Sequence, residues 1–333
     1  MAETIPSPPA LSTGREWEPY AIPGVNVMLR RYKGPRGPDV PTIDPNYHFR
    51  EEMVRELAWA AWPHDGGEWS PCLLAGGKGS GKTTLVLQVA AHCNIPVYRL
   101  NCNSGTTSRH LKGRVVASKG GTNFSPGVAT RAMEEGAWLL LDELAGLSPD
   151  VALTLFPILE PDGAVLLEDA MPARYVNRHP DFRIFGTDNS IGASQEATRF
   201  NYAGTNRVNS ALLDRFHSFI EVPYMDKEDE FRVAKALAPG IEDVDLEGII
   251  LTASNIRNSD SGIAFSTRMV IAWARRVAAG TLYADGTRKK ADDRDIYEAA
   301  GPAFLNKMNS VQARDLVKEA LQTVYGFEFE DED

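Results

Sequence analysis

The stretch Gly76-Gly-Lys-Gly-Ser-Gly-Lys-Thr83 matches the pattern G-x-x-x-x-G-K-[ST] in full. It follows the apolar run Pro71-Cys-Leu-Leu-Ala75 and precedes a helical stretch that opens at Thr84. Glycine lets the backbone turn tightly, so that successive N–H groups face a polyphosphate at the positive end of the following helix. The stretch therefore predicts a phosphate-binding loop between a buried strand and a helix.

ATP and Mg²⁺ are the cofactors that this loop predicts. Lys82 is expected to contact the β- and γ-phosphates, and the Thr83 hydroxyl is expected to coordinate the metal ion. The residues predicted to bind the nucleotide are Gly76, Gly77, Lys78, Gly79, Ser80, Gly81, Lys82, Thr83 and Thr84.

A second acidic site is predicted where another apolar strand ends, in Trp138-Leu-Leu-Leu-Asp142-Glu143. Asp142 is placed to hold Mg²⁺ through water, together with Thr83. Glu143 is placed to polarise the water that attacks the γ-phosphate. A carboxylate at this position favours hydrolysis over nucleotide sensing alone.

Two further residues are expected to reach the same site. Asn189 ends the strand Phe182-Arg-Ile-Phe-Gly-Thr-Asp-Asn189, where its amide could orient the attacking water. The alternative for Asn189 is a turn-capping role, because Asn is favoured in turns. Arg268, in Ser266-Thr-Arg268, opens a helix of a second domain and could reach the nucleotide across a cleft, or be an ordinary helix-face arginine.

An arginine that acts on a neighbouring subunit is predicted at Arg215, in Ala211-Leu-Leu-Asp-Arg215-Phe216. Cations supplied in this way accelerate phosphoryl transfer by about 10³–10⁵. An ion pair with Asp214 or Glu221 is the alternative for Arg215. Arg199 and Arg207 are weaker candidates for the same task.

Strands and helices alternate through the first two thirds of the chain, which predicts an α/β fold with a parallel sheet. The expected strands are Pro71–Ala75, Val97–Leu100, Trp138–Leu141, Arg183–Gly186 and Ser218–Val222. From Asp226 onward the apolar spacing is helical, with helices expected at Lys227–Leu237, Leu246–Asn255, Thr267–Ala279 and Asp293–Val324, the last broken near Pro302. The fold predicted is a five-stranded α/β domain followed by a small all-α domain.

The domain boundaries follow from these patterns and from proline. Residues 1–45 hold nine of the 21 prolines and are expected to form an extended arm, either one that wraps a neighbour or a loose leader. Aromatic and apolar residues such as Trp17, Tyr20 and Ile22 favour an arm that docks. The α/β domain is placed at 46–224 and the helical domain at 225–333.

Composition restricts the function without naming it. The 333 residues carry a net charge of −10, which disfavours a protein that coats nucleic acid or an anionic membrane. Three cysteines without a CxxC pair argue against a disulfide framework or a structural zinc site. The sequence shows no signal peptide and no transmembrane stretch, so a cytoplasmic location is predicted.

The order of Gly76–Thr83, Asp142-Glu143, Asn189, Arg215 and Arg268 resembles the AAA+ ATPases, in which these positions match Walker A, Walker B, sensor 1, arginine finger and sensor 2. Residues of about 111–127 look like the helix-2 insert of the MoxR branch. Residues of about 162–178 look like the pre-sensor hairpin of that branch. The resemblance implies an AAA+ module whose second domain is the α-helical lid.

Within that branch the chain is most similar to the AAA+ subunits of aerobic cobaltochelatases. The similarity covers almost the whole chain and includes Val40–Phe49, Gly204–Ser210, Ser266–Trp273, Phe304–Lys307 and Val324–Phe327. It implies a hexameric ring, and a partner with a von Willebrand-type metal-binding domain. It further implies an ATPase that remodels a protein client, of the kind found in MoxR-type chaperones, with the two inserts contacting the client.

Two other classes stay open. One is a nucleic-acid motor of a restriction or replication system, which the basic residues Lys112, Arg114 and Lys119 favour. The net charge and the lack of a helix-turn-helix or zinc module disfavour it. The other is a nucleotide-gated scaffold with negligible turnover, in which Glu143 would have no role.

Overall fold

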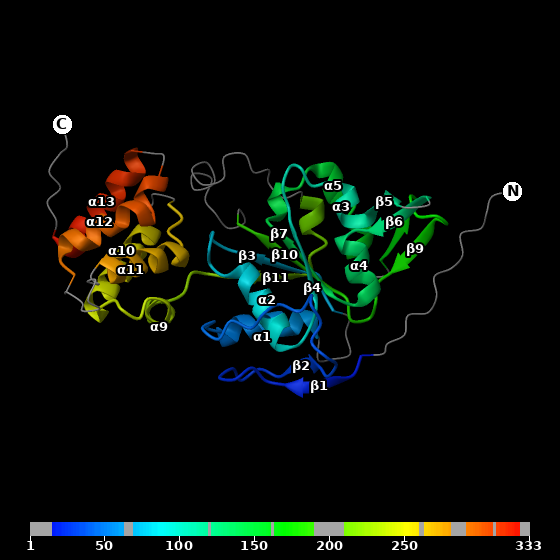
Figure 1. The fold of residues 1–333 in the computed structure, drawn as a ribbon, viewed down its shortest axis with the longest axis horizontal. Helices are drawn as coiled ribbons and strands as arrows, with labels where there is room; N and C mark the ends of the chain where they lie inside the picture. Colours follow the sequence, from blue (N-terminus) through cyan, green and yellow to red (C-terminus); the bar gives the residue numbers. More distant parts are fainter. Residues whose placement is uncertain are drawn as a thin grey trace.

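The computed structural model describes residues 15–62, 69–118, 121–160, 163–189, 210–259, 263–280, 291–308 and 311–326. Within these ranges the chain forms an α/β body and a helical region on one side of it (Figure 1).

A five-stranded parallel sheet is the centre of the α/β body. Its spatial order is β11-β3-β10-β7-β4, and every neighbouring pair is parallel. The strands are β3 (Cys72–Ala75), β4 (Val97–Asn101), β7 (Trp138–Asp142), β10 (Arg183–Asp188) and β11 (Ser218–Glu221). The predicted fold class and the predicted strands are confirmed, each to within two residues.

Helices cover both faces of this sheet, which explains why its strands read as continuous apolar runs. In β7, Trp138 and Leu140 pack with α1 and α2, whereas Leu139 and Leu141 pack with α4, α5 and α6. These helices are α1 (Glu51–Ala61), α2 (Lys82–His92), α4 (Val128–Glu135), α5 (Pro149–Leu153) and α6 (Phe156–Leu159). Parallel strands between two helical layers end at one edge, so polar residues that follow them gather there.

The proline-rich segment packs against the α/β body of its own chain. Strands β1 (Trp17–Tyr20) and β2 (Leu29–Tyr32) pair in antiparallel fashion below α1 (Figure 1). Ile22, Val25, Val27 and Leu29 are buried in the same cluster as α1 and α2. Because these side chains join the core of the α/β body, this part of the segment docks on its own chain.

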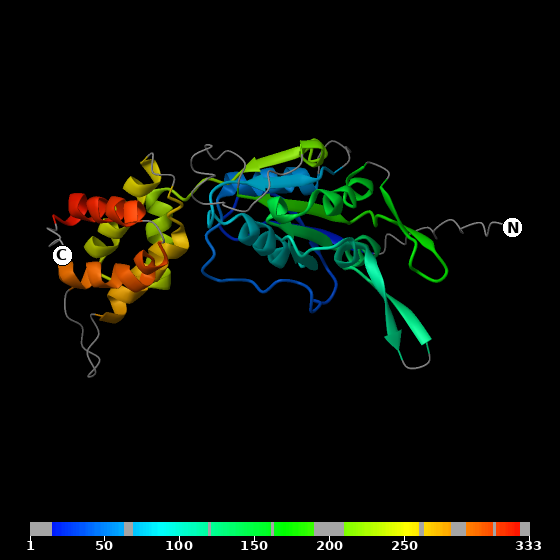
Figure 2. The ribbon, with the colours of Figure 1, turned by 90° about the horizontal axis from the view of Figure 1, so that it is seen from above.

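Two β-hairpins project from the α/β body on the side away from the helical region (Figure 2). The first joins β5 (Gly113–Ser118) to β6 (Gly121–Pro126) after the short helix α3 (Ser108–Lys112). The second joins β8 (Ala164–Leu167) to β9 (Arg174–Asn177). Their positions in the chain coincide with the two segments that resemble the helix-2 insert and the pre-sensor hairpin.

The helical region follows the short α8 (Ser210–Leu213) and β11. It contains α9 (Lys227–Leu237), α10 (Asp243–Asn258), α11 (Thr267–Gly280), α12 (Asp293–Ala303) and α13 (Val311–Tyr325). These helices bury a cluster of their own around Trp273, Phe265 and Phe304. We propose a domain boundary near residue 225, because this cluster shares no residue with the clusters of the α/β body. Among the described helices, none is both long and apolar enough to cross a bilayer.

Candidate active site

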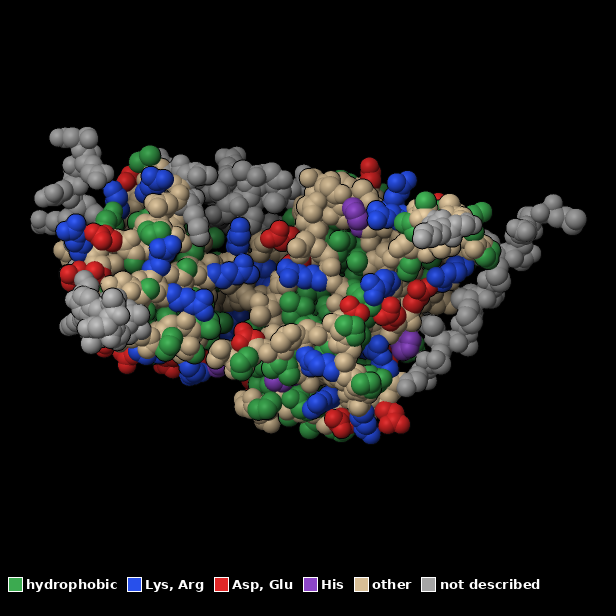
Figure 3. Space-filling model, in the orientation of Figure 1, with side chains coloured by type: hydrophobic (Ala, Val, Ile, Leu, Met, Phe, Trp, Pro, Cys, Tyr) green, Lys and Arg blue, Asp and Glu red, His purple; other side chains and the backbone are tan. Residues whose placement is uncertain are grey.

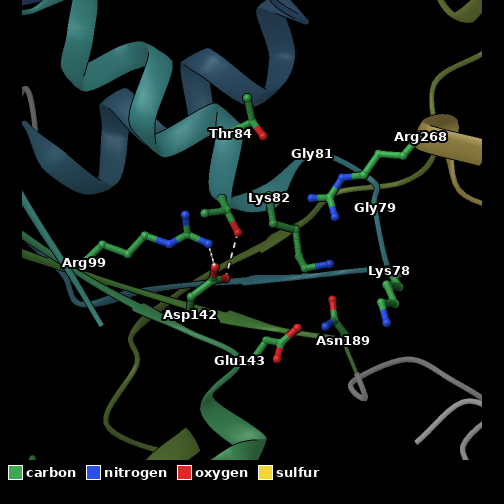
Figure 4. Close-up of a pocket in the computed structure, with 11 residues that line it drawn as sticks. Lys78, Gly79, Gly81, Lys82, Thr84, Arg99, Asp142, Glu143, Asn189 and Arg268 are labelled. Atoms are coloured by element: carbon green, nitrogen blue, oxygen red, sulfur yellow. Dashed lines mark hydrogen bonds and ion pairs between the residues drawn. The ribbon is translucent and has the colours of Figure 1, made fainter. Parts of the chain in front are cut away.

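A pocket lies at the carboxyl ends of β7 and β10 and at the start of α2 (Figure 4). It is lined by polar and charged side chains that come from five separate segments of the chain. The lining residues are Lys78, Gly79, Gly81, Lys82, Thr83, Thr84, Arg99, Asp142, Glu143, Asn189 and Arg268. Six of these residues carry a charged side chain, which is typical of a site for a charged ligand.

The loop before α2 can be built only with glycine at two of its positions. Gly76 has a φ of +147°, and a Cβ there would lie 2.2 Å from the carbonyl oxygen of Val222. Gly79 has a φ of +79°, and a Cβ there would lie 2.5 Å from Cβ of Ser266, just before α11. The left-handed backbone and the close neighbours together exclude side chains. The loop is therefore clamped between the end of β11 and the helical region.

Lys82 is buried at the start of α2 and points into this loop. Its Nζ donates hydrogen bonds to the carbonyl oxygens of Gly76 and Gly77, both over 2.8 Å. Burial lowers the pKa of Lys82 to about 8, although the carboxylates of Asp142 and Glu143 act in the opposite direction. An ammonium that is held by neutral carbonyl groups is poised to accept a stronger anionic partner.

Asp142 accepts hydrogen bonds on both of its carboxylate oxygens. Oδ1 accepts from Thr83 Oγ1 over 2.7 Å and from Thr187 Oγ1 over 2.5 Å, and Oδ2 pairs with Arg99 Nη2. Burial alone would raise the pKa of Asp142, but these three donors outweigh it and lower the pKa. Asp142 is therefore ionised at neutral pH. A hydroxyl beside an ionised carboxylate is a donor set that suits Mg²⁺, which prefers oxygen ligands and keeps several waters.

Glu143 adopts a left-handed backbone with φ of +60° and ψ of +56°. Two hydrogen bonds hold it there: its N–H donates to Thr187 Oγ1 over 3.0 Å, and its carbonyl accepts from Gly146 N over 2.8 Å. A non-glycine residue in this region costs about 1–3 kcal/mol and persists only where its surroundings enforce it. The strained backbone turns the Glu143 side chain away from the core and into the pocket, where it is exposed.

Asn189 and Arg268 reach the pocket from different parts of the fold. Asn189 directly follows β10, and its side chain lies beside that of Glu143 below Lys82 (Figure 4). Arg268 is the second residue of α11 and extends toward the loop from the side opposite to Arg99 (Figure 4). The structure thus brings together both residues that the sequence placed at the site on weaker signals.

Arg215 lies outside this pocket. It follows α8, and its Nε donates to Glu160 Oε1 over 2.9 Å. The predicted ion-pair partners, Asp214 and Glu221, are wrong. The residue that pairs with Arg215 is Glu160, which directly follows α6 and lies next to the guanidinium in the fold. Arg199 and Arg207, the weaker candidates for the same task, lie outside the described residues.

Sequence reasoning missed Arg99 and Thr187. Arg99 interrupts the edge strand β4 with a charge, and its position next to β7 in the sheet brings it to Asp142. Thr187 carries a hydroxyl two residues before Asn189, inside the buried strand β10. A polar residue inside each short strand was the available signal, but only the strand order shows that both residues contact Asp142.

A second layer of contacts joins the loop to the helical region. Tyr224 follows β11, and its hydroxyl donates to the carbonyl oxygen of Lys78 over 3.1 Å. The guanidinium of Arg257, from α10, stacks 4.6 Å from the centre of the Tyr224 ring. Arg257 also forms two hydrogen bonds of 2.7 Å with the buried carboxylate of Glu230 in α9. The carbonyl of Lys78 is therefore linked through Tyr224 and Arg257 to Glu230 in the helical region.

Basic side chains also gather on the surface near this pocket. Figure 3 shows Lys and Arg side chains across the middle of one face, between the helical region and the α/β body. The chain as a whole carries a net charge of −10, so the positive charge near the pocket differs in sign from that of the whole chain. Such a distribution attracts a small polyanion to the cleft.

Residues 71–216 match the family described as AAA domain (dynein-related subfamily). The chain is 30% identical to the aerobic cobaltochelatase subunit CobS of Sinorhizobium sp over 304 residues. This alignment covers 88% of this chain and 85% of CobS. It is 28% identical to the gas vesicle ATPase GvpN of Haloferax mediterranei over 205 residues, 56% of each chain.

The fold is similar to that of RuvB of Thermotoga maritima. The two superpose with a TM-score of 0.52 over 78% of this chain and 71% of that chain, at 18% sequence identity. At that identity the similarity concerns the fold alone.

Proposed function

This chain belongs to the AAA+ ATPases of the MoxR, CobS, GvpN and NorQ type, and we propose that it couples Mg²⁺-dependent ATP hydrolysis to the remodelling of a protein partner. Membership of the family implies that the chain uses and hydrolyses ATP. The roles of individual residues, the metal ion, the ring and the partner belong to the proposal.

Nucleotide binding is assigned to the loop and to Lys82. The backbone N–H groups from Gly76 to Thr83 face the phosphates at the start of α2, where the helix dipole favours negative charge. Lys82 exchanges its two carbonyl partners for β- and γ-phosphate oxygens. That exchange restores full charge on the ammonium, because a phosphate raises the pKa that burial has lowered.

Thr83 and Asp142 would hold the metal ion. When bound there, Mg²⁺ supplies positive charge to the β- and γ-phosphate oxygens. The fit rests on the donor set: the Thr83 hydroxyl lies 2.7 Å from an ionised carboxylate oxygen of Asp142. Arg99 and Thr187 keep that carboxylate charged and oriented.

Glu143 is assigned as the general base. It accepts a proton from the water whose oxygen attacks the γ-phosphorus, and the bond from that phosphorus to the ADP oxygen breaks. Asn189, beside Glu143, orients the water through its amide. Arg268 neutralises charge on the phosphates from the helical region.

The cation that completes the site is proposed to come from Arg215 of the next subunit in a ring. The position of Arg215 supports this proposal. Arg215 lies outside the pocket of its own chain and precedes the start of β11, whereas the pocket lies at the carboxyl ends of β7 and β10, which run parallel to β11 in the same sheet. Arg215 and the site residues of one chain thus lie on different parts of the body, as two faces of a head-to-tail ring interface require.

A protein is the proposed client. The β5–β6 and β8–β9 hairpins project from the body and expose apolar side chains: Val115 is 44% exposed, Tyr175 41% and Met171 87%. Exposed apolar groups on projecting hairpins suit contact with protein better than with a phosphate backbone. The similarity to a cobaltochelatase subunit supports a metal-insertion assembly as the specific form, with a partner that bears a von Willebrand-type metal-binding domain.

The observation that carries the function is Glu143, held in a strained backbone beside an ionised Asp142. Glu143→Gln keeps the shape and removes the base, so we expect hydrolysis to fall by about 10²–10⁴. ATP binding by the variant should stay within a few-fold of the original chain, because the loop and Lys82 are untouched.

Turnover and equilibrium binding of labelled ATP, measured on the same preparations, test this assignment. Undiminished turnover by Glu143→Gln would support a nucleotide-gated scaffold or another base. The variant, loaded with ATP, also serves to capture the client. A co-purified protein supports the proposal, whereas nucleic acid in the eluate, with salt-sensitive stimulation of hydrolysis, supports a nucleic-acid motor.

A further inference from the structure

Three contacts hold the Arg215 guanidinium in one orientation within its own chain. Its Nε donates to Glu160 Oε1 over 2.9 Å, and its Nη1 donates to the carbonyl oxygen of Ala211 over 2.8 Å. Its central carbon lies 3.8 Å from the centre of the Phe156 ring. A planar group with two hydrogen bonds and one face on an aromatic ring has little rotational freedom left.

These contacts leave part of the guanidinium available for an anion. An arginine side chain has five N–H donors. Two of them are used, and among the described residues Nη2 makes no hydrogen bond. The side chain is 28% exposed. These contacts therefore fix the orientation of the Arg215 side chain and leave N–H donors for binding an anion.

Glu160 and Phe156 belong to the segment that leads into the β8–β9 hairpin. Phe156 opens α6, and Glu160 follows its last residue. The Glu160 N–H donates to the Phe156 carbonyl over 3.1 Å, and the Glu160 carbonyl accepts from Gly163 N over 3.0 Å. β8 begins at the next residue, Ala164. Both partners of Arg215 thus stand on the base of a projecting hairpin.

The exit of the hairpin is tied to the same helix. Arg178, directly after β9, donates from Nη1 to the carbonyl oxygen of Ile158 in α6 over 3.3 Å. α6 is therefore in contact with the chain that enters the hairpin and with the chain that leaves it. A displacement of the hairpin moves α6, and with it the two groups that orient Arg215.

We infer that Glu160 and Phe156 are positioning residues for Arg215, and that they make the orientation of this arginine depend on the β8–β9 hairpin. The inference rests on the proposed function, in which Arg215 acts on the nucleotide of the next subunit. The hairpin of one subunit then controls hydrolysis in its neighbour, not in itself. A client that displaces the hairpin of one subunit would therefore change hydrolysis in the next subunit of the ring, and the effect would have one direction around the ring.

Single variants give the first test. Glu160→Ala should lower kcat by about tenfold, because small misplacements of a catalytic group have large effects on rate. KM for ATP should stay within about twofold, since Glu160 is not in the pocket of its own chain. Glu160→Gln keeps an oxygen acceptor for Nε and should retain most of the turnover. Glu56→Ala, at an exposed residue of α1, is the matched control and should leave kcat unchanged.

Mixed assemblies test the direction of the effect. Glu143→Gln and Arg215→Ala chains are each expected to be inactive alone, and mixing them should restore turnover where a Glu143→Gln chain donates Arg215 to an Arg215→Ala chain. Glu160→Ala added to the Glu143→Gln chain should reduce the restored turnover by about tenfold. The same substitution in the Arg215→Ala chain has no arginine to orient, so the restored turnover should not change.

The outcomes separate the two ideas. Absence of restored turnover in the first mixture would overturn both the action of Arg215 on a neighbour and the inference that rests on it. Restored turnover that falls equally with Glu160→Ala in either chain, or in neither, would overturn the inference alone. If Glu160→Ala proves unstable in thermal unfolding, Phe156→Leu replaces it in the donor chain, where loss of the aromatic face should also lower the restored turnover.

Discussion

The backbone N–H of Glu143 donates a hydrogen bond to Thr187 Oγ1 over 3.0 Å, and the same hydroxyl donates to Asp142 Oδ1 over 2.5 Å. One buried threonine of β10 therefore holds two consecutive carboxylate residues at the end of β7. It contacts the proposed base through its backbone and the proposed metal ligand through its side chain.

Thr187→Val should disable this arrangement without changing the volume of the side chain. The variant leaves the Glu143 N–H without its partner, so we expect the free energy of unfolding to fall by about 1–3 kcal/mol. The turnover number should fall by about tenfold or more, because the left-handed backbone of Glu143 loses one of its two restraints. Chemical denaturation and steady-state kinetics measure the two effects. Thr187→Ser retains the hydroxyl and should behave almost like the original chain; equal losses in both variants would contradict the role of the hydrogen bonds.

Nucleotide affinity should decrease as the pH rises above about 8. In the empty site burial lowers the pKa of Lys82 to about 8, so at higher pH the amine is increasingly neutral. Phosphate binds the charged form, so binding requires a proton to be taken up at alkaline pH. Affinity should therefore fall by up to about tenfold per pH unit above that value. Titration calorimetry at pH 9 in two buffers of different ionisation enthalpy measures the proton uptake.

Lys82→Arg is the control for this titration, because a guanidinium stays charged throughout. We expect it to bind nucleotide more weakly, and with an affinity that changes little between pH 7 and pH 9.5. A pH dependence as steep as that of the original chain would assign the titration to another group.

Gly79→Ala should weaken nucleotide binding by about tenfold or more. A side chain at this position is strained by the φ of +79° and would meet Cβ of Ser266 at 2.5 Å, so the loop and the helical region must move apart. Fluorescent-nucleotide titration measures the effect. Ser266→Gly in the same variant removes the steric contact and leaves the backbone strain, so it should recover only part of the affinity. Full recovery would show that the contact alone matters.

Arg99→Met should reduce stability in a manner that depends on pH. The pKa of Asp142 is lowered in the folded chain, so its contribution to stability is present above the unfolded value of about 3.9 and is lost as the pH falls through the folded value. Arg99 is one of the groups that lower this pKa. Because Arg99 is partly exposed, we expect a loss of only about 1 kcal/mol at pH 7.

Urea denaturation at pH 7 and at pH 3 tests this expectation. The difference between Arg99→Met and the original chain should shrink at the lower pH, where Asp142 is protonated in more of the molecules. Arg109→Met, at an exposed arginine of α3, is the matched control and should show no such dependence. A difference of the same size at both pH values would indicate that Arg99 stabilises the chain by packing.

Local sequence patterns predicted the fold and most of the pocket because the signals concerned are local. The loop of 76–83 lies between its strand and helix, and Asp142 and Asn189 come at or just after strand ends. Parallel strands between two helical layers place those ends together. The contacts that sequence reasoning missed depend on strand order or on segments far apart in the chain. Arg99 meets Asp142 because β4 is next to β7, and Glu160 meets Arg215 across 55 positions.

The stacking of Arg257 on Tyr224, whose hydroxyl donates to the Lys78 carbonyl, has a thermodynamic consequence. A ligand that shifts the loop at Lys78 changes the energy of the arginine–tyrosine contact, and a change in the position of α10 alters the loop by the same amount of free energy. Such coupling is reciprocal for binding equilibria. A partner that binds the helical region and favours one position of α10 therefore changes the affinity for nucleotide. Nucleotide changes the affinity for that partner by the same factor, although the two ligands do not contact each other.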